Sequence, residues 1–174
     1  SLLTMAELLT TAPDILAHSA AHVLGAALEA QYGDTVQLCD GPALGNGEFF
    51  YEGALRAPAA VSAHELPLLE RRMLTLTMQN HPFERVTVSK DAAHAFFTGN
   101  AFKQHFVRQI ERLDAHEPVT LYRCGPFVDL CKGPHLPRTG LIKGVALHKT
   151  SGALWMGSGR VGDPAGEMAS LPLQ

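Results

Sequence analysis

Cysteine is scarce in this sequence of 174 residues, and the three present, Cys39, Cys124 and Cys131, are an odd number. Small secreted proteins that rely on disulfides carry more, so we predict free thiols in a reducing compartment. Also missing are a run of about 18 apolar residues, the length that crosses a membrane, and an initial secretory signal. We therefore expect a cytoplasmic protein without a membrane partner.

Charge of one sign is lacking as well, since 14 basic residues stand against 17 acidic ones and the formal net charge is −3. This excludes a protein that binds nucleic acid through a positive field over its whole surface. Basic residues nevertheless gather in residues 123–149, where Asp129 is the single acid. Candidates there for contacts with phosphates are Arg123, Lys132 and Lys143. The alternative interpretation is a solvated strand face.

Helical patterns come early in the chain and strand patterns come late. Residues 13–33 have apolar positions at helical spacing, with Pro13 suited to the first turn and Gly33 to the end. Further helices are expected at residues 62–80 and 89–97, and a helical or irregular piece is expected at residues 102–113. Strands are expected at residues 35–39, 48–52, 83–88, 119–123, 127–131, 141–148 and 153–156.

This order predicts an α+β fold, in which helices pack on a mostly antiparallel sheet. The hydrophobic fraction of 46% is ordinary for a globular protein, and residues 1–174 suit one domain. Residues 157–170 contain many glycines and are expected to form a mobile loop.

Two groups of side chains stand out for their chemistry. His18 and His22 are four residues apart on a predicted helix and project from one face. Asp129 and Cys131 alternate on a strand, and His135 follows in a turn that can fold back toward them. Three histidines and a cysteine would suit zinc if they converged tetrahedrally. Alternatively, Cys131 is a small buried core residue and the histidines are structural.

These motifs resemble the editing domain of threonyl-tRNA synthetases. The match begins with HSAAH at residues 18–22, is densest at YRCGP in residues 122–126 and DLCKGPH in residues 129–135, and is most similar to the eukaryotic cytosolic type. Residues 46–52 depart from the family pattern by one inserted residue. It therefore stays open which of Phe49, Phe50 and Tyr51 lines the pocket.

The resemblance implies an aminoacyl-tRNA hydrolase that removes serine from the acceptor end of tRNA(Thr) and rejects threonyl-tRNA(Thr). It assigns water activation and proton transfer to His18 and Lys103, and leaves open whether Lys103 is a base or a fixed cation. Expected substrate contacts come from His22, Asp129, Cys131 and His135. The resemblance implies no cofactor and no metal. Leu173 and Gln174 resemble the point where the family's chain continues, so we expect the rest of a synthetase in cis.

Two other functions are consistent with these residues. A zinc-dependent deacylase of the alanyl-tRNA editing type uses a similar set of histidines and cysteine as metal ligands. A non-catalytic tRNA-binding module would keep the fold without the activity. The second is less consistent with the sequence, because an inactive pocket has no chemical reason to retain all six of the polar side chains considered above. These are His18, His22, Lys103, Asp129, Cys131 and His135.

Overall fold

The computed structural model describes residues 5–45, 47–56 and 60–151, with the backbone alone described for residues 5–11 and 43–45. In chain order the elements are α1 (Met5–Tyr32), β1 (Val36–Leu38), β2 (Ala43–Gly45), β3 (Glu48–Phe49), β4 (Gly53–Leu55), α2 (Leu66–Met78), β5 (Phe83–Val88), α3 (Lys90–Phe96), α4 (Ala101–Leu113), β6 (Val119–Cys124) and β7 (Phe127–Leu130). Short 3-10 turns cover Gly33–Thr35, Ala63–Glu65 and Thr139–Leu141. The α+β class is confirmed.

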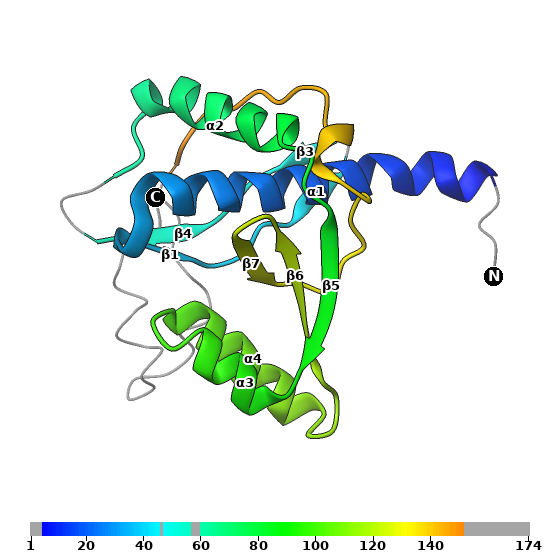
Figure 1. Cartoon of the computed structure of the whole chain (residues 1–174), viewed down its shortest axis with the longest axis vertical. Coiled ribbons are helices and arrows are strands. Elements are labelled where there is room, and N and C mark those ends of the chain that lie inside the picture. Colours follow the sequence, from blue (N-terminus) through cyan, green and yellow to red (C-terminus); the bar gives the residue numbers. More distant parts are fainter. Residues whose placement is uncertain (1–4, 46, 57–59, 152–174) are drawn as a thin grey trace.

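Helix α1 runs through the centre of the fold (Figure 1). It begins before Pro13, so the predicted start there is wrong. Proline removes one backbone N–H but keeps a helical φ, which explains how the helix continues through it. Between residues 17 and 28 the buried positions include many alanines. These short side chains let α2 and the strands pack close to the helix.

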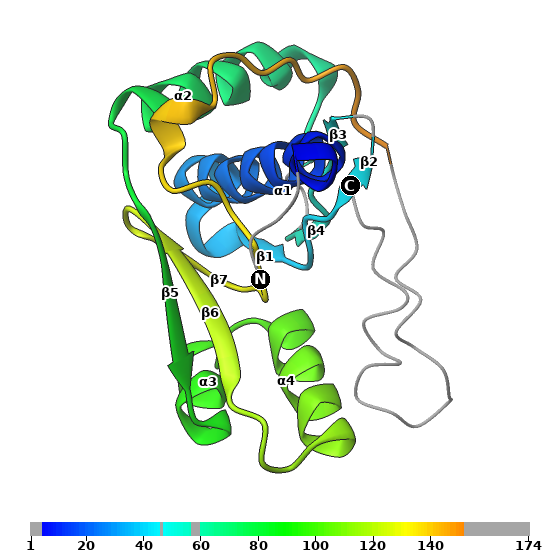
Figure 2. The same cartoon turned by 90° about the vertical axis from the view of Figure 1, so that its right-hand side faces the viewer.

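Strands β5, β6 and β7 form an antiparallel sheet in that order (Figure 2). Leu121 of β6 packs with Ala93 of α3 and Val107 of α4. Cys124 lies an odd number of positions further along β6, so it projects from the opposite face. It packs in the cluster that contains α1 residues such as Val23. One strand therefore contributes to both hydrophobic clusters.

Two short antiparallel pairs, β1 with β4 and β2 with β3, flank α1. The single strand expected at residues 48–52 is wrong, because the chain leaves β3 after Phe49 and starts β4 at Gly53. The intervening segment is held by its backbone: Glu52 N–H donates to Asp40 O at 2.8 Å, and Cys39 N–H donates to Glu52 O at 2.7 Å. These bonds fix Tyr51 next to α1 without a continuous strand.

The strand predicted at residues 141–148 is also wrong. Thr139–Leu141 form a 3-10 turn, and residues 142–151 run as irregular chain along α2 (Figure 1). The apolar residues of this segment are still buried, because Val145 and Leu147 pack on the central hydrophobic cluster. The backbone is held by a side chain, since Leu147 N–H donates to Glu70 Oε1 at 2.6 Å. A side chain therefore takes the place of a neighbouring strand.

The strand expected at residues 153–156 and the loop expected at residues 157–170 lie outside the described residues. Within residues 5–45, 47–56 and 60–151, no helix is both long enough and apolar enough to span a membrane.

Candidate functional site

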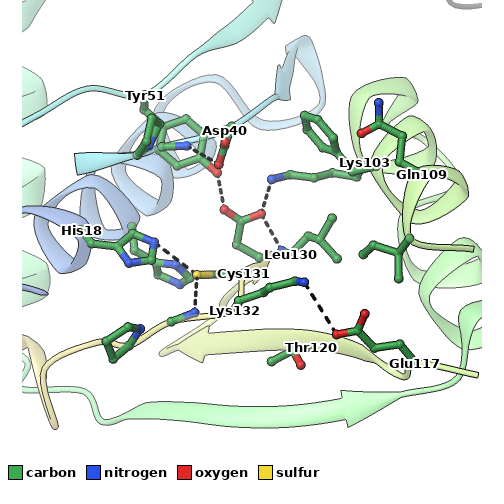
Figure 3. A pocket seen from close by; sticks show the side chains of 18 of the residues that line it. His18, Asp40, Tyr51, Lys103, Gln109, Glu117, Thr120, Leu130, Cys131 and Lys132 are labelled. Atoms are coloured by element: carbon green, nitrogen blue, oxygen red, sulfur yellow. Dashed lines mark hydrogen bonds and ion pairs between the residues drawn. The ribbon is translucent and has the colours of Figure 1, made fainter. Parts of the chain in front are cut away.

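A cavity of about 620 Å³ opens between α1, the loop at residues 40–42, α4 and the end of β7 (Figure 3). Its walls hold six of the side chains singled out from the sequence, which are His18, His22, Lys103, Asp129, Cys131 and Lys132. His135 is not a wall residue and instead contacts Cys131. The fold thus brings together residues from both ends of the described chain.

Asp129 is the centre of the polar wall. One carboxylate oxygen, Oδ1, forms an ion pair with Lys103 Nζ and accepts the N–H of Leu130 at 2.7 Å. The other oxygen, Oδ2, accepts the hydroxyl of Tyr51. Burial by itself raises the pKa of Asp129, but the charge of Lys103, the proximity of His22 and these hydrogen bonds lower it below its ordinary value. Asp129 is therefore a carboxylate that accepts a hydrogen bond at each oxygen and whose charge is balanced by Lys103.

Lys103 is held in place by the start of α4. Asn100 caps this helix, since its Oδ1 accepts the N–H of Lys103 at 3.1 Å. Asn100 Nδ2 donates to Leu38 O at 2.8 Å, which ties α4 to β1. Only 2% of the Lys103 side chain is exposed, so it is not a solvated surface lysine. Because an ion-paired ammonium has no lone pair for a proton, this arrangement suits a fixed cation better than a base.

Of Phe49, Phe50 and Tyr51, among which the sequence left the choice open, Tyr51 is the one that lines the cavity. Its ring lies in a slot between two glycines: a Cβ added at Gly25 would be 2.5 Å from the ring, and one added at Gly41 would overlap it more closely. Burial raises the pKa of Tyr51 well above its ordinary value, and Asp129 reinforces this shift. Tyr51 is therefore a neutral donor that orients Asp129.

Cys131, His18 and His135 form a second polar group beside this carboxylate. Cys131 Sγ lies 3.3 Å from His18 Nε2 and 3.2 Å from His135 Nε2, and the Gly133 N–H donates to it at 3.2 Å. Gly133 turns the chain with a φ of +73°, which glycine adopts without strain. Burial raises the pKa of Cys131 to about 11, so it is a neutral thiol at pH 7 and not an activated nucleophile.

The hydrogen-bond network assigns the tautomer of His135. The Ser19 hydroxyl donates to Ile15 O at 2.8 Å, so it accepts from His135 Nδ1 at 3.2 Å. The lone pair on Nε2 then accepts the thiol proton of Cys131. Burial, together with His22 and His18, lowers the pKa of His135 to about 2, consistent with a neutral ring. Ser19 thereby orients the imidazole that holds Cys131.

His22 lies deeper than the other two histidines. Its ring packs edge-on against Phe127 at 4.9 Å and Phe83 at 5.6 Å between centroids. Burial lowers its pKa to about 4, and the opposing effect of Asp129 is smaller, so His22 is neutral at pH 7. Its Nε2 is buried, with no hydrogen-bonding partner among the described residues.

The three basic candidates do not form one surface at the cavity. Lys132 lines it and lies 3.6 Å from Glu117 at its edge. Arg123 pairs instead with Glu84 on β5 at 2.6 Å, and Lys143 donates to Gly140 O at 2.6 Å; neither is a wall residue. Only Lys132 therefore has a place suited to the mouth of the cavity.

Three residues that shape the site were not predicted as site residues, namely Ser19, Asp40 and Asn100. Ser19 lies inside HSAAH, so its position was the available signal. Asn100 precedes a helix, where asparagine commonly caps. Nothing in the spacing of Asp40 separates it from other loop acids.

The group that could hold a metal ion among the described residues consists of His18, Cys131 and His135, whose ligand atoms lie within 4.8 Å of one another. His22, the fourth member of the set considered from the sequence, is not part of it. Three ligands with an open position suit catalytic zinc. The thiol and imidazoles, however, already satisfy one another by hydrogen bonds at 3.2 to 3.3 Å. A metal-free site stays a prediction.

The sequence of this chain matches a known protein family and several known proteins. Residues 119–153, which include β6, β7 and the turn with Cys131, match the family described as threonyl and alanyl tRNA synthetase second additional domain. The chain is 42% identical over 144 residues to "Threonine–tRNA ligase, mitochondrial 1" of Arabidopsis thaliana, covering 83% of this chain and 20% of that protein.

Two further relatives carry similar names. "Threonine–tRNA ligase 2, cytoplasmic" of Mus musculus is 43% identical over 141 residues, covering 81% of this chain and 17% of that protein. "Threonine–tRNA ligase" of Syntrophotalea carbinolica is 44% identical over 146 residues, covering 83% of this chain and 22% of that protein. The matched part thus spans about a fifth of each of these curated relatives.

Proposed function

Because this chain belongs to the threonyl-type second additional domains of tRNA synthetases, we propose that it hydrolyses the ester of serine wrongly attached to tRNA(Thr) and spares threonyl-tRNA(Thr). It acts as part of a threonine–tRNA ligase in the cytoplasm, with the rest of the synthetase in cis and the tRNA acceptor end as its partner. The observation that carries the proposal is the buried ion pair of Lys103 and Asp129 in a cavity shared with His18.

The chemical need for such an activity lies in the similarity of the two amino acids. Serine lacks only one methyl group of threonine, and one methyl group changes binding by roughly 1–3 kcal/mol. A synthetic site for threonine therefore accepts serine at an appreciable rate. A second site that hydrolyses the smaller ester restores accuracy.

Ester hydrolysis passes through a tetrahedral intermediate, whose oxygen becomes negative as water attacks the carbonyl carbon. The Lys103 ammonium supplies a positive charge fixed by Asp129 and by the first turn of α4. A charge fixed in a mostly water-excluded wall needs little reorganisation during the reaction. This geometry supports Lys103 as the group that stabilises the oxyanion.

The proton of the attacking water needs an acceptor, and the ribose oxygen that leaves needs a donor. His18 lines the cavity, and its Nε2 contacts Cys131 Sγ, which limits the ring to one orientation. His22 and His135 are packed or hydrogen-bonded in the protein interior and neutral at pH 7. These differences support His18 as the proton carrier, with His135 and Cys131 as the groups that position it.

Selection against threonine must be steric. Threonine keeps the hydroxyl and the amino group of serine, so polar contacts cannot separate the two. In a close-packed wall the extra methyl group either clashes or displaces the attacking water. Lys132 at the mouth of the cavity is the basic residue best placed for the acceptor end, with Arg123 and Lys143 as weaker candidates.

The test is single-turnover deacylation of seryl-tRNA(Thr) and threonyl-tRNA(Thr) by the chain at equal concentrations. We expect the seryl ester to be hydrolysed at least about a hundredfold faster, because exclusion of an oversized group is not limited to the energy of one lost methyl contact. Equal rates would indicate a nonspecific esterase. Absence of hydrolysis of either ester would leave a tRNA-binding module as the better explanation.

A second candidate is a zinc-dependent deacylase of the alanyl type, favoured by the convergence of His18, Cys131 and His135. It predicts stoichiometric zinc in the purified chain and hydrolysis of seryl-tRNA that a chelator abolishes and zinc restores. Elemental analysis and that chelator experiment separate the two functions.

A further inference from the structure

The seryl ester carries an α-amino group, and α-amino groups of this kind are largely protonated near pH 7. A site for the ester therefore needs an acceptor for an ammonium group. Asp129 is the obvious acid, but Lys103, the Leu130 N–H and the Tyr51 hydroxyl already use three of the roughly four lone pairs of its carboxylate. Its charge is also balanced by Lys103, so a carboxylate without a cation of its own is better suited to an ammonium group.

Asp40 lies in the same cavity, beside Tyr51 and across from Lys103 (Figure 3). Its Oδ1 accepts the N–H of Gly41 at 2.8 Å, the one hydrogen bond recorded for this carboxylate within the described part of the chain. The backbone of Asp40 is fixed as well, since its carbonyl accepts the N–H of Glu52 at 2.8 Å. The carboxylate is therefore oriented by its own loop and keeps capacity for a ligand.

The charge of Asp40 also affects the pKa values of side chains in the site. Burial and then the charge of Asp129 raise the pKa values of Tyr51 and Cys131, and the negative charge of Asp40 adds a smaller rise. Both of those side chains belong to the polar wall around Asp129, which places the charge of Asp40 within range of the reacting end of the cavity.

We propose that Asp40 receives the α-ammonium group of the bound amino acid and so makes the site selective for esters of free, unblocked amino acids. The inference rests on the hydrolysis proposed above and adds a residue and a substrate requirement to it. Asp129 then serves to hold Lys103, while Asp40 binds the substrate. Glu117 is the less suitable acid because Lys132 lies 3.6 Å from it.

The experiment combines a change in the protein with a change in the substrate. Asp40→Asn keeps the size of the side chain and removes its charge. The substrates are seryl-tRNA(Thr) and the ester of the same tRNA in which a hydroxyl replaces the α-amino group. Asp34→Asn is the matched control, since Asp34 is an exposed acid outside the cavity walls, and Asp14→Asn tests the rival acid.

We expect Asp40→Asn to lower kcat/KM for the seryl ester by roughly tenfold to a hundredfold, mainly through KM, as for loss of a hydrogen bond to a charged group. The same variant should change kcat/KM for the hydroxy ester by less than about threefold. Asp34→Asn should leave kcat/KM unchanged for both esters. An equal loss on both esters, no loss on either, or a selective loss with Asp14→Asn in place of Asp40→Asn overturns the inference.

The wild-type chain separates this inference from the function on which it rests. If it hydrolyses both esters equally well, the ammonium requirement is wrong while the hydrolase function stands. If it hydrolyses no seryl-tRNA(Thr), the proposed function itself fails, and the role of Asp40 fails with it.

Discussion

Replacing Lys103 with methionine tests the buried ion pair at the centre of the site. The two side chains are almost completely buried, with Lys103 exposed by 2% and Asp129 by 7%. Removing the ammonium leaves a carboxylate in the protein interior with Tyr51 and the Leu130 N–H as its remaining partners. Breaking a buried pair in this way costs about 3 kcal/mol or more of the free energy of unfolding.

The contribution of Asp129 to the pH dependence of stability should have opposite signs in the wild type and in Lys103→Met. In the wild type the pKa of Asp129 is lowered, so its contribution is present above the unfolded value of about 3.9 and is lost as the pH falls. In Lys103→Met, burial dominates and raises the folded pKa above the unfolded one. The carboxylate then destabilises the fold at neutral pH, and this penalty disappears as the pH falls toward the unfolded pKa.

The assay is urea unfolding at pH 7.5 and pH 5.5, followed by circular dichroism. Lys103→Met with Asp129→Asn should recover most of the loss, because the second change removes the unpaired charge. Lys132→Met is the matched control, since Lys132 is exposed and its contact with Glu117 should contribute less than about 1 kcal/mol. A Lys103→Met variant as stable as the wild type at pH 7.5 would refute the reasoning.

Three further predictions follow from the site. Lys103→Ala and His18→Ala should each slow deacylation of seryl-tRNA(Thr) by about a hundredfold or more, and wild-type rates in folded variants would contradict their assignment. The purified chain should contain no stoichiometric metal and keep its activity with a chelator; loss of activity restored by zinc would favour the alanyl-type mechanism. Gly25→Ala should displace Tyr51, lowering the free energy of unfolding by about 1–3 kcal/mol and slowing deacylation, whereas an unchanged rate would show that the slot is not needed.

Sequence patterns alone determined the elements with strong local signals. The capping-box pattern predicted the helix after Ser62, and Ser89 was predicted to cap the helix that begins at Lys90; both are confirmed. Strands β5, β6 and β7 were predicted within a residue of their observed ends. These features depend on residues close together in the chain, where capping and alternation act directly.

The local patterns were misleading where packing against distant residues decided the structure. Residues 141–148 alternate like a strand, yet Leu147 N–H bonds to Glu70 and the apolar side chains pack beside α2. The choice of Tyr51 over its aromatic neighbours depends on the space left by Gly25, which lies on a different element. Neither contact has a signal in its own stretch of sequence.

The candidate site shows the same division. The spacing of residues identified His18 and Asp129 as chemically relevant, and the family resemblance added Lys103. The folded chain pairs Lys103 with Asp129, brings three donors to the Asp129 carboxylate, and leaves Asp40 with capacity for a ligand. Hydrogen-bond capacity is shared among groups brought together from distant parts of the chain, so it becomes defined only when the chain is folded.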